Sequence, residues 1–307
     1  MIYQLFRKLI KAAIWLFCKE LIVVNQAVFT TKGPLLVVAN HPNSFLDAIL
    51  IGAQFSGKMH FLARGDAFQQ KHHGFFLRLL NMIPIYRLSE GKENLHLNEY
   101  AFTESRRILA SGGIVLIFIE GICINSHILQ PFKKGAARIA SGLDLQKPLL
   151  VLPVAIAYDS LTRFGKKVRI AAAEPIPAKK LLPFKETAKN HSFLNQQIRL
   201  KLGPLIQFPE NRAKRQYLPG KLMSIPGRIL HFPLYKIISA IVRNKTRGTV
   251  FYDSVLFAVL LLLYPFYLFL IGCLLFAASV NPVLIALIIL IHPLLARATV
   301  LFTHNDV

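Results

Sequence analysis

Acidic residues are scarce in this chain of 307 residues: 15 Asp and Glu stand against 37 Lys and Arg, and the formal net charge is +22. Such an excess of cations indicates an anionic partner, which is a nucleic acid, a membrane surface or a phosphorylated substrate. Hydrophobic residues make up 54% of the chain, more than an ordinary soluble enzyme contains. The two features together favour a membrane surface. Since the sequence has no recognisable nucleic-acid-binding module, we expect no nucleic-acid partner.

Cysteine is also rare. Cys18, Cys123 and Cys273 lie far apart and in unlike sequence contexts. They have neither the paired spacing of a zinc site nor the density of a disulfide framework. We therefore expect a core that faces a reducing compartment, the cytoplasm.

Long apolar runs are confined to the C-terminal end of the chain. Residues 255–278 are apolar throughout and long enough to cross a bilayer. A turn at residues 279–282 separates them from a shorter apolar run at residues 283–296. The pattern predicts a transmembrane hairpin within residues 251–307. Basic residues flank this hairpin at Arg243, Lys245, Arg247 and Arg297. By the positive-inside rule, we expect both ends of the hairpin, and the domain that precedes it, to face the cytoplasm at the cell membrane.

The N-terminal residues 2–24 repeat apolar positions every three or four residues, with basic residues between them. This spacing predicts an amphipathic helix that lies on anionic lipid, with Trp15 near the headgroups. Lysines interrupt the apolar run, unlike the core of a signal peptide. We assign residues 1–28 to this membrane-surface helix. The alternative is a helix that packs against a soluble domain.

The central part of the chain, residues 29–210, alternates short apolar runs with helical patterns. Strands are predicted at residues 35–39, 59–63, 82–87, 114–119, 149–156 and from 168 onward, and helices at 44–54, 68–80, 95–110, 135–141 and 192–205. This alternation predicts an α/β domain in which helices flank a layered sheet, with ligands at the carboxyl ends of strands. Residues 211–250 are expected to be a basic connecting segment of loop or surface helix.

A histidine follows the first predicted strand of this domain. His41 and Pro42 come directly after residues 35–39, and Pro42 ends the strand. Asp47 lies in the first turn of the helix that follows, where the helix dipole keeps it ionised. An ionised Asp beside an imidazole fixes its tautomer and stabilises the imidazolium, so His41 is a candidate general base. The alternative is a turn histidine with a hydrogen-bonding role only.

Other polar residues lie at the ends of predicted strands. Arg64 and Arg87 each end a strand, and Arg binds phosphate with a planar fork of donors. Glu120 follows the most apolar strand, where a carboxylate needs a partner. We expect it to bind Arg87 or an acceptor hydroxyl.

Five blocks of sequence, in order, now match one pattern. Residues 40–47 resemble the His-and-Asp first motif of the glycerol-phosphate and lysophosphatidate acyltransferases. Residues 83–87 and 118–121 are similar to the second and third motifs of that family. Residues 131–136 resemble its Pro-Phe-Lys-Arg-Gly-Ala stretch, and residues 152–156 its fourth motif. The chain is therefore identified as resembling the lysophospholipid acyltransferase superfamily.

The sequence differs from the usual motifs of this family at two places. Five residues separate His41 from Asp47, where most members have four. This spacing is similar to that of the eukaryotic glycerol-phosphate/dihydroxyacetone-phosphate branch, which also carries a C-terminal membrane pair. In addition, Ile122 and Cys123 stand where many members have Thr-Arg. This loss of one arginine leaves the acceptor open, between lysophosphatidate and another hydroxyl or amino lipid.

The resemblance implies a membrane-bound acyltransferase of phospholipid biosynthesis that needs no metal or cofactor. It would move a fatty acyl group from acyl-CoA or acyl-carrier protein to glycerol 3-phosphate or a lysophospholipid such as 1-acylglycerol 3-phosphate. His41 and Asp47 would be catalytic. The residues expected to bind substrate are Asn43, Ser44, Arg64, Arg87, Glu120, Gly121, Lys133 and Lys134.

Backbone N–H groups at residues 43–46 or around Gly121 are candidate donors to the oxyanion. Lys133 and Lys134 would meet phosphate or the donor's carrier, or form only a solvated charge run.

Three alternatives remain open at this point. The chain could acylate a non-phosphate lysolipid, such as an amino-acid lipid. It could also be a membrane-docking lipid-binding protein without catalysis. Within the acyltransferase reading, Cys123 could serve as an acylated nucleophile with His41 as its base.

Overall fold

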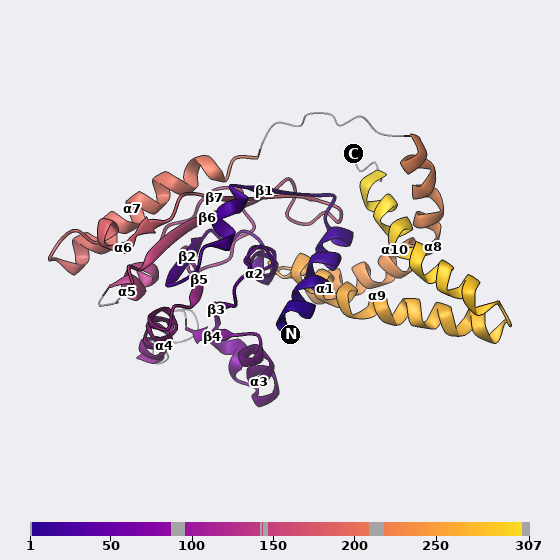
Figure 1. Cartoon of the computed structure of the whole chain (residues 1–307), viewed down its shortest axis with the longest axis horizontal. Coiled ribbons are helices and arrows are strands. Elements are labelled where there is room, and N and C mark those ends of the chain that lie inside the picture. Colours follow the sequence, from indigo (N-terminus) through magenta and orange to yellow (C-terminus); the bar gives the residue numbers. More distant parts are fainter. Residues whose placement is uncertain (1, 87–95, 142, 144–146, 209–217, 303–307) are drawn as a thin grey trace.

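The computed structural model describes residues 2–86, 96–141, 143, 147–208 and 218–302, and Figure 1 shows a sheet with flanking helices beside a group of C-terminal helices. The α-helices are α1 (Ile2–Phe17), α2 (Ser44–Gly52), α3 (Lys71–Leu79), α4 (Asn98–Ala110), α5 (Gly135–Ala140), α6 (Ala178–Leu181), α7 (Thr187–Leu205), α8 (Leu218–Lys245), α9 (Tyr252–Ala277) and α10 (Pro282–Phe302). The strands are β1 (Glu20–Val24), β2 (Leu35–Ala39), β3 (Met59–Arg64), β4 (Met82–Ile85), β5 (Ile114–Phe118), β6 (Leu150–Tyr158), β7 (Lys167–Ala172) and β8 (Ile176–Pro177).

The described strands form one mixed sheet. Its order is β1-β7-β6-β2-β5-β3-β4, and β8 pairs with β6. Strands β2 to β6 are mutually parallel, whereas β7 and β8 run antiparallel to β6. Because parallel neighbours end at the same edge, the residues after β2, β3 and β5 are brought together there.

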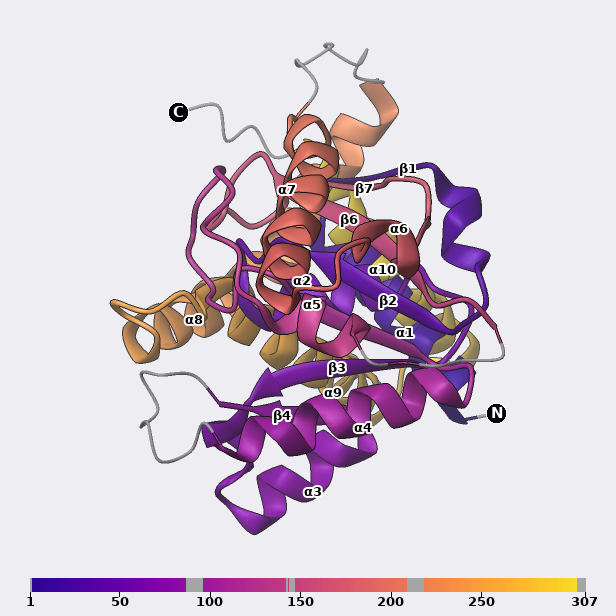
Figure 2. The same ribbon diagram turned by 90° about the vertical axis from the view of Figure 1, so that its left-hand side faces the viewer.

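Two apolar cores cover the two faces of the sheet. In β2, Leu35, Val37 and Ala39 belong to the core under α1, α2 and α9, whereas Leu36 and Val38 belong to the core under α4, α5 and α7. Figure 2 shows α5, α6 and α7 in front of the sheet and α1, α9 and α10 behind it. A strand buried on both faces needs apolar residues throughout, and each fully buried Leu or Val contributes roughly 1.5–3 kcal/mol.

The C-terminal helices are apolar and exposed. Residues Leu222–Lys245, Tyr252–Ala277 and Pro282–Phe302 are each long and apolar enough to cross a membrane, among the residues searched. Helices α8 and α10 touch closely at Gly227, where an added Cβ would lie 2.2 Å from the Leu295 carbonyl oxygen. Glycine therefore allows these two helix backbones to approach each other.

Helix α1 lies between the sheet and the C-terminal helices (Figure 1). Ile10, Ile14 and Phe17 are buried in the core of the sheet. Arg297 of α10 donates hydrogen bonds to the carbonyl oxygens at the end of α1, and its guanidinium lies 5.0 Å from the centre of the Trp15 ring. One face of α1 thus packs as the soluble-domain alternative expects. Apolar side chains remain exposed on the rest of the helix at Leu5, Phe6, Leu9 and Trp15.

The α/β sheet with flanking helices is confirmed, with element ends displaced by a few residues. Two expectations need correction. The helix expected over residues 2–24 ends at Phe17, and Glu20–Val24 forms strand β1 parallel to β7. The β-branched run Ile22–Val24 favours that pairing, which outweighs the helical spacing before it.

The connecting segment expected at residues 211–250 is also more than loop or surface helix. Residues 218–245 form the long helix α8, whose exposed apolar side chains include Ile225, Ile229 and Ile237. Scattered Lys, Arg and Pro residues concealed this apolar character in the sequence. The hairpin of α9 and α10 therefore has a third apolar helix beside it.

Candidate active site

The turn between β2 and α2 brings His41 and Asp47 together. The Nδ1 atom of His41 lies 2.9 Å from the Oδ2 atom of Asp47. The Asp47 side chain is fully buried, whereas 12% of the His41 side chain is exposed. Ser44, in the first position of α2 between these two residues, has a positive φ of 54°. The predicted pairing of imidazole and carboxylate is present.

Two further groups donate to the Asp47 carboxylate. The backbone N–H of Asn43 donates to Oδ2 over 2.8 Å, and the Tyr158 hydroxyl donates to Oδ1 over 2.5 Å. Burial, together with the adjacent Asp47, raises the pKa of Tyr158 well above its ordinary value, so the phenol keeps its proton for this bond. These donors hold a charged carboxylate that would otherwise be costly to bury.

Tyr158 lies beyond the last matching motif, and no sequence motif predicts a role for it. The only signal was its position at the end of a buried strand, with alternate residues Val154 and Ile156 on the same face. A polar aromatic group at that point needs a buried partner. Its partner, Asp47, lies 111 residues earlier in the chain.

Phe118 fixes the plane of the His41 ring. The two rings are stacked, with centroids 3.8 Å apart and planes within 8°. Since Nδ1 faces Asp47, the imidazole presents Nε2 as the nitrogen that exchanges a proton with a substrate. The ring therefore has a set orientation and a set tautomer.

Glu120 is buried, with 3% exposure, and connects the loop that contains His41 with the loop that contains Gln130. Its oxygens accept hydrogen bonds from the backbone N–H groups of His41 and Gln130, each over 2.9 Å. Burial raises the pKa of this carboxyl group, partly opposed by these two hydrogen bonds. The expected partner Arg87 lies outside the described residues. The sequence did not predict that the Glu120 carboxylate binds a main-chain donor in the turn between β2 and α2. We call this turn, residues 40–47, the candidate catalytic turn, or catalytic turn for short.

Four of the expected oxyanion donors already have partners. The N–H of Ser44 donates to the sulfur of Cys123, the N–H of Leu46 to the Ser254 hydroxyl, and the N–H of Gly121 to the Phe118 carbonyl. Together with Asn43, whose N–H donates to Asp47, these groups are occupied in the protein as it stands. An oxyanion bound by one of these four groups would have to displace its present partner.

The cations expected to bind substrate are spread along the edge of the sheet. Arg64 is paired with Asp66 and lies 5.6 Å from the centre of the Phe251 ring. Lys133 and Lys134 are exposed, and the Lys133 side chain passes close to Gly121, whose φ is 63°. Among the described cations, the Lys133 side chain therefore lies against the loop that contains Glu120 and Gly121.

Two buried charges behind the catalytic turn were not anticipated. Lys166, in the segment between β6 and β7, forms an ion pair with Asp253 of α9, and both side chains are fully buried. Asp253 also accepts a hydrogen bond of 2.8 Å from the Asn43 side chain. Burial lowers the pKa of Lys166 to about 7, partly opposed by nearby groups that include the carboxylates of Asp159 and Asp47.

A large cavity lies away from His41. It measures about 1630 Å³ and is lined by residues of α1, α8, α9 and α10, together with the segment that contains Phe164 and Lys167. Neither His41 nor Asp47 lines it. Within the described residues, no three His, Cys, Asp or Glu side chains come together as a group that could hold a metal ion.

Comparison with known proteins identifies the fold unit that carries this site. Residues 20–157 match the family model described as Acyltransferase. This segment contains the catalytic turn, Glu120 and most of β6. This part of the chain is therefore similar to the acyltransferase family, as the sequence motifs predict.

Individual relatives are more distant. Lysophosphatidylcholine acyltransferase 2 of Danio rerio is 30% identical over 152 residues, which cover 48% of this chain but only 27% of that protein. The chain thus matches about a quarter of the length of this relative. The crystal structure of the 1-acyl-sn-glycerophosphate (LPA) acyltransferase PlsC from Thermotoga maritima covers 69% of this chain and 81% of its own, with a TM-score of 0.48 and 22% identity.

Proposed function

We propose that this protein transfers a fatty acyl group from a thioester donor, acyl-CoA or acyl-carrier protein, to the hydroxyl of glycerol 3-phosphate or a lysophospholipid. The observation that carries the proposal is the contact of 2.9 Å between His41 and the fully buried Asp47. In the proposed step, Nε2 of His41 removes the hydroxyl proton as the oxygen attacks the thioester carbonyl. Asp47 holds the ring and stabilises the imidazolium, which then protonates the departing thiolate.

The reaction is proposed to take place at the cytoplasmic face of the cell membrane. Three helices with the length and composition of membrane spans support this location. The net charge of +22 supports contact with anionic lipid. No metal or other cofactor is required, because both proton transfers are assigned to His41.

The small number of cations available at the site favours a second class of acceptor. Ile122 and Cys123 follow Gly121 in place of a further arginine, and Arg64 is paired with Asp66. These features reduce the positive charge free to bind a phosphate. An uncharged or amino-acid lysolipid is therefore the alternative acceptor for the same chemistry.

The test is an acyl-transfer assay on the protein purified in detergent. Labelled acyl-CoA and acyl-carrier protein are each offered with glycerol 3-phosphate, lysophosphatidate and an uncharged lysolipid. Removal of a general base costs about 10²- to 10⁴-fold in rate, so we expect His41→Ala to lower kcat by at least 100-fold. The control is His191→Ala on α7, which does not contact the catalytic turn and should retain full activity.

A His41→Ala protein with activity close to wild type would refute general-base catalysis. No transfer to any acceptor by the folded wild-type protein would favour the non-catalytic, lipid-binding alternative.

A further inference from the structure

The first turn of α9 lies against the turn that carries His41, although about 210 residues separate them. The side chain of Asn43 donates to Asp253 over 2.8 Å. The N–H of Leu46 donates to the Ser254 hydroxyl over 2.9 Å, and this hydroxyl donates to the Asn43 carbonyl over 3.0 Å. An apolar helix that shares a hydrophobic core with α2 is thus also joined to the catalytic turn by polar contacts.

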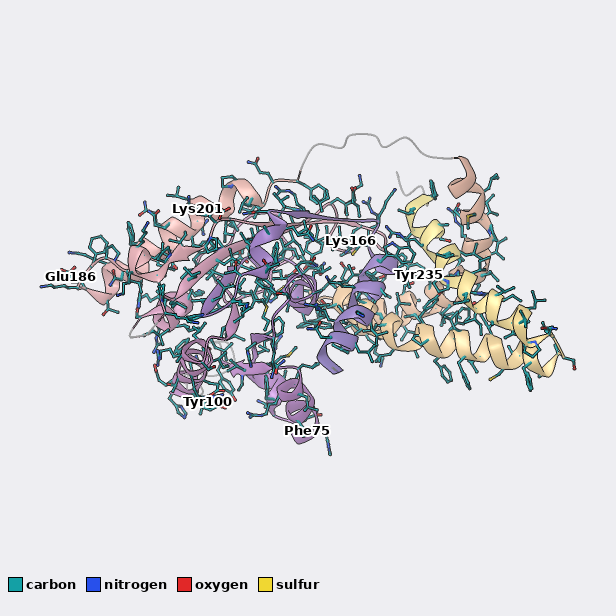
Figure 3. All side chains as sticks on the ribbon, in the orientation of Figure 1. Phe75, Tyr100, Lys166, Glu186, Lys201 and Tyr235 are labelled. Carbon is teal, nitrogen blue, oxygen red and sulfur yellow. The ribbon has the colours of Figure 1, made fainter. Side chains whose placement is uncertain are left out.

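Lys166 closes these contacts into a ring. Its ammonium group pairs with Asp253 and lies 5.7 Å from the centre of the Tyr158 ring. Tyr158 in turn donates to Asp47. Figure 3 labels Lys166 at the junction between the sheet and the C-terminal helices. The ring therefore includes both sides of the catalytic carboxylate, through Asn43 on one side and Tyr158 on the other.

Membrane attachment alone does not explain this arrangement. Burial of two charges costs about as much as their attraction returns, and an apolar pair of the same volume would hold two elements together equally well. The polar contacts do provide direction, because each fixes the orientation of a named group. Asp253 accepts a hydrogen bond from the Asn43 side chain and so orients it. The backbone N–H of Asn43 donates to Oδ2 of Asp47.

We propose that Asp253 and Ser254 of α9 are positioning residues for acyl transfer, so that the membrane helix is a structural part of the active site. The inference rests on the proposed function. None of these residues touches the reacting atoms. They hold the turn in which Asp47 contacts His41. A change at Asp253 would affect the position of Asp47 through one intervening residue, Asn43.

The experiment compares two double variants that both lack the ion pair. Asp253→Asn with Lys166→Met keeps an oxygen that accepts from the Asn43 side chain, and it offers an amide to the Asn43 Oδ1 atom, which lacks a partner. Asp253→Ala with Lys166→Met removes the acceptor. Each full-length protein is purified in detergent, and its kcat, KM and melting temperature are measured. Thr246→Val, at a buried residue bonded only within its own turn region, is the matched control.

We expect the Asn/Met protein to keep kcat within about threefold of wild type. The Ala/Met protein should lose at least tenfold in kcat, with little change in KM and a similar melting temperature. Ser254→Ala, which adds no unpaired charge, should also lower kcat and provides a variant that folds if the double variants do not. Equal kcat in both double variants, with Ser254→Ala unchanged, would overturn the inference.

His41→Ala is assayed beside these proteins. If it is active, the proposed function fails. If it is inactive while the Ala/Met and Ser254→Ala proteins work at full rate, only the positioning role fails.

Discussion

Tyr158→Phe is the most direct test of how Asp47 is held. The substitution keeps the buried ring, and with it the contact with Lys166, but removes the hydroxyl that donates to Asp47 over 2.5 Å. A hydrogen bond to a charged group contributes about 1.5–3 kcal/mol. If this full amount supports the transition state, kcat falls by about 10- to 100-fold, since each 1.4 kcal/mol is a factor of ten.

The assay measures kcat and KM at saturating acyl donor, with the melting temperature of each protein. KM should change little, because Tyr158 does not reach the substrate edge of the site. Tyr267→Phe is the matched control, since its hydroxyl donates only to the Leu230 carbonyl. If Tyr158→Phe retains kcat within twofold of wild type, the hydroxyl does not support catalysis and the reasoning is refuted.

Two other predictions concern Glu120 and Cys123. Because burial raises the pKa of Glu120 above 4.5, the folded protein binds more protons than the unfolded chain above that pH. Its stability should therefore fall as the pH rises through the folded-state pKa, by up to about 1.4 kcal/mol per pH unit. Glu120→Gln should flatten this part of the curve in denaturant titrations, and identical slopes would contradict the assignment. Cys123→Ala should keep most activity, because its sulfur accepts from Ser44 and is not needed as a nucleophile. An acyl-thioester trapped on Cys123, with loss of activity in Cys123→Ala, would support the rival mechanism instead.

Local pattern was sufficient for much of the fold. The central strands are runs of Leu, Ile and Val, and each is buried on both faces of the sheet, so composition and length identify them. Residues 2–24 show where local pattern fails. Their spacing is helical, but Ile22–Val24 form a strand because β7 offers an edge with which to pair.

The candidate site divides in the same way. His41 and Asp47 are six residues apart on one turn, and chain geometry brings them close. Glu120 was expected at the site, but its partners are main-chain N–H groups that no sequence pattern specifies. No sequence motif includes Tyr158, Lys166 or Asp253. Each of these residues binds a partner that is distant in the chain.

The amino-acid sequence by itself determined the alternation of strands and helices, the C-terminal apolar hairpin and the pairing of His41 with Asp47, because these depend on periodicity, length and short-range spacing. Only the tertiary structure decided what surrounds the Asp47 carboxylate. The donors come from β6 and the catalytic turn, and the supporting charges from the β6–β7 segment and α9. Their contacts arise when the sheet and helices pack, and buried polar groups must then find partners wherever the fold places them.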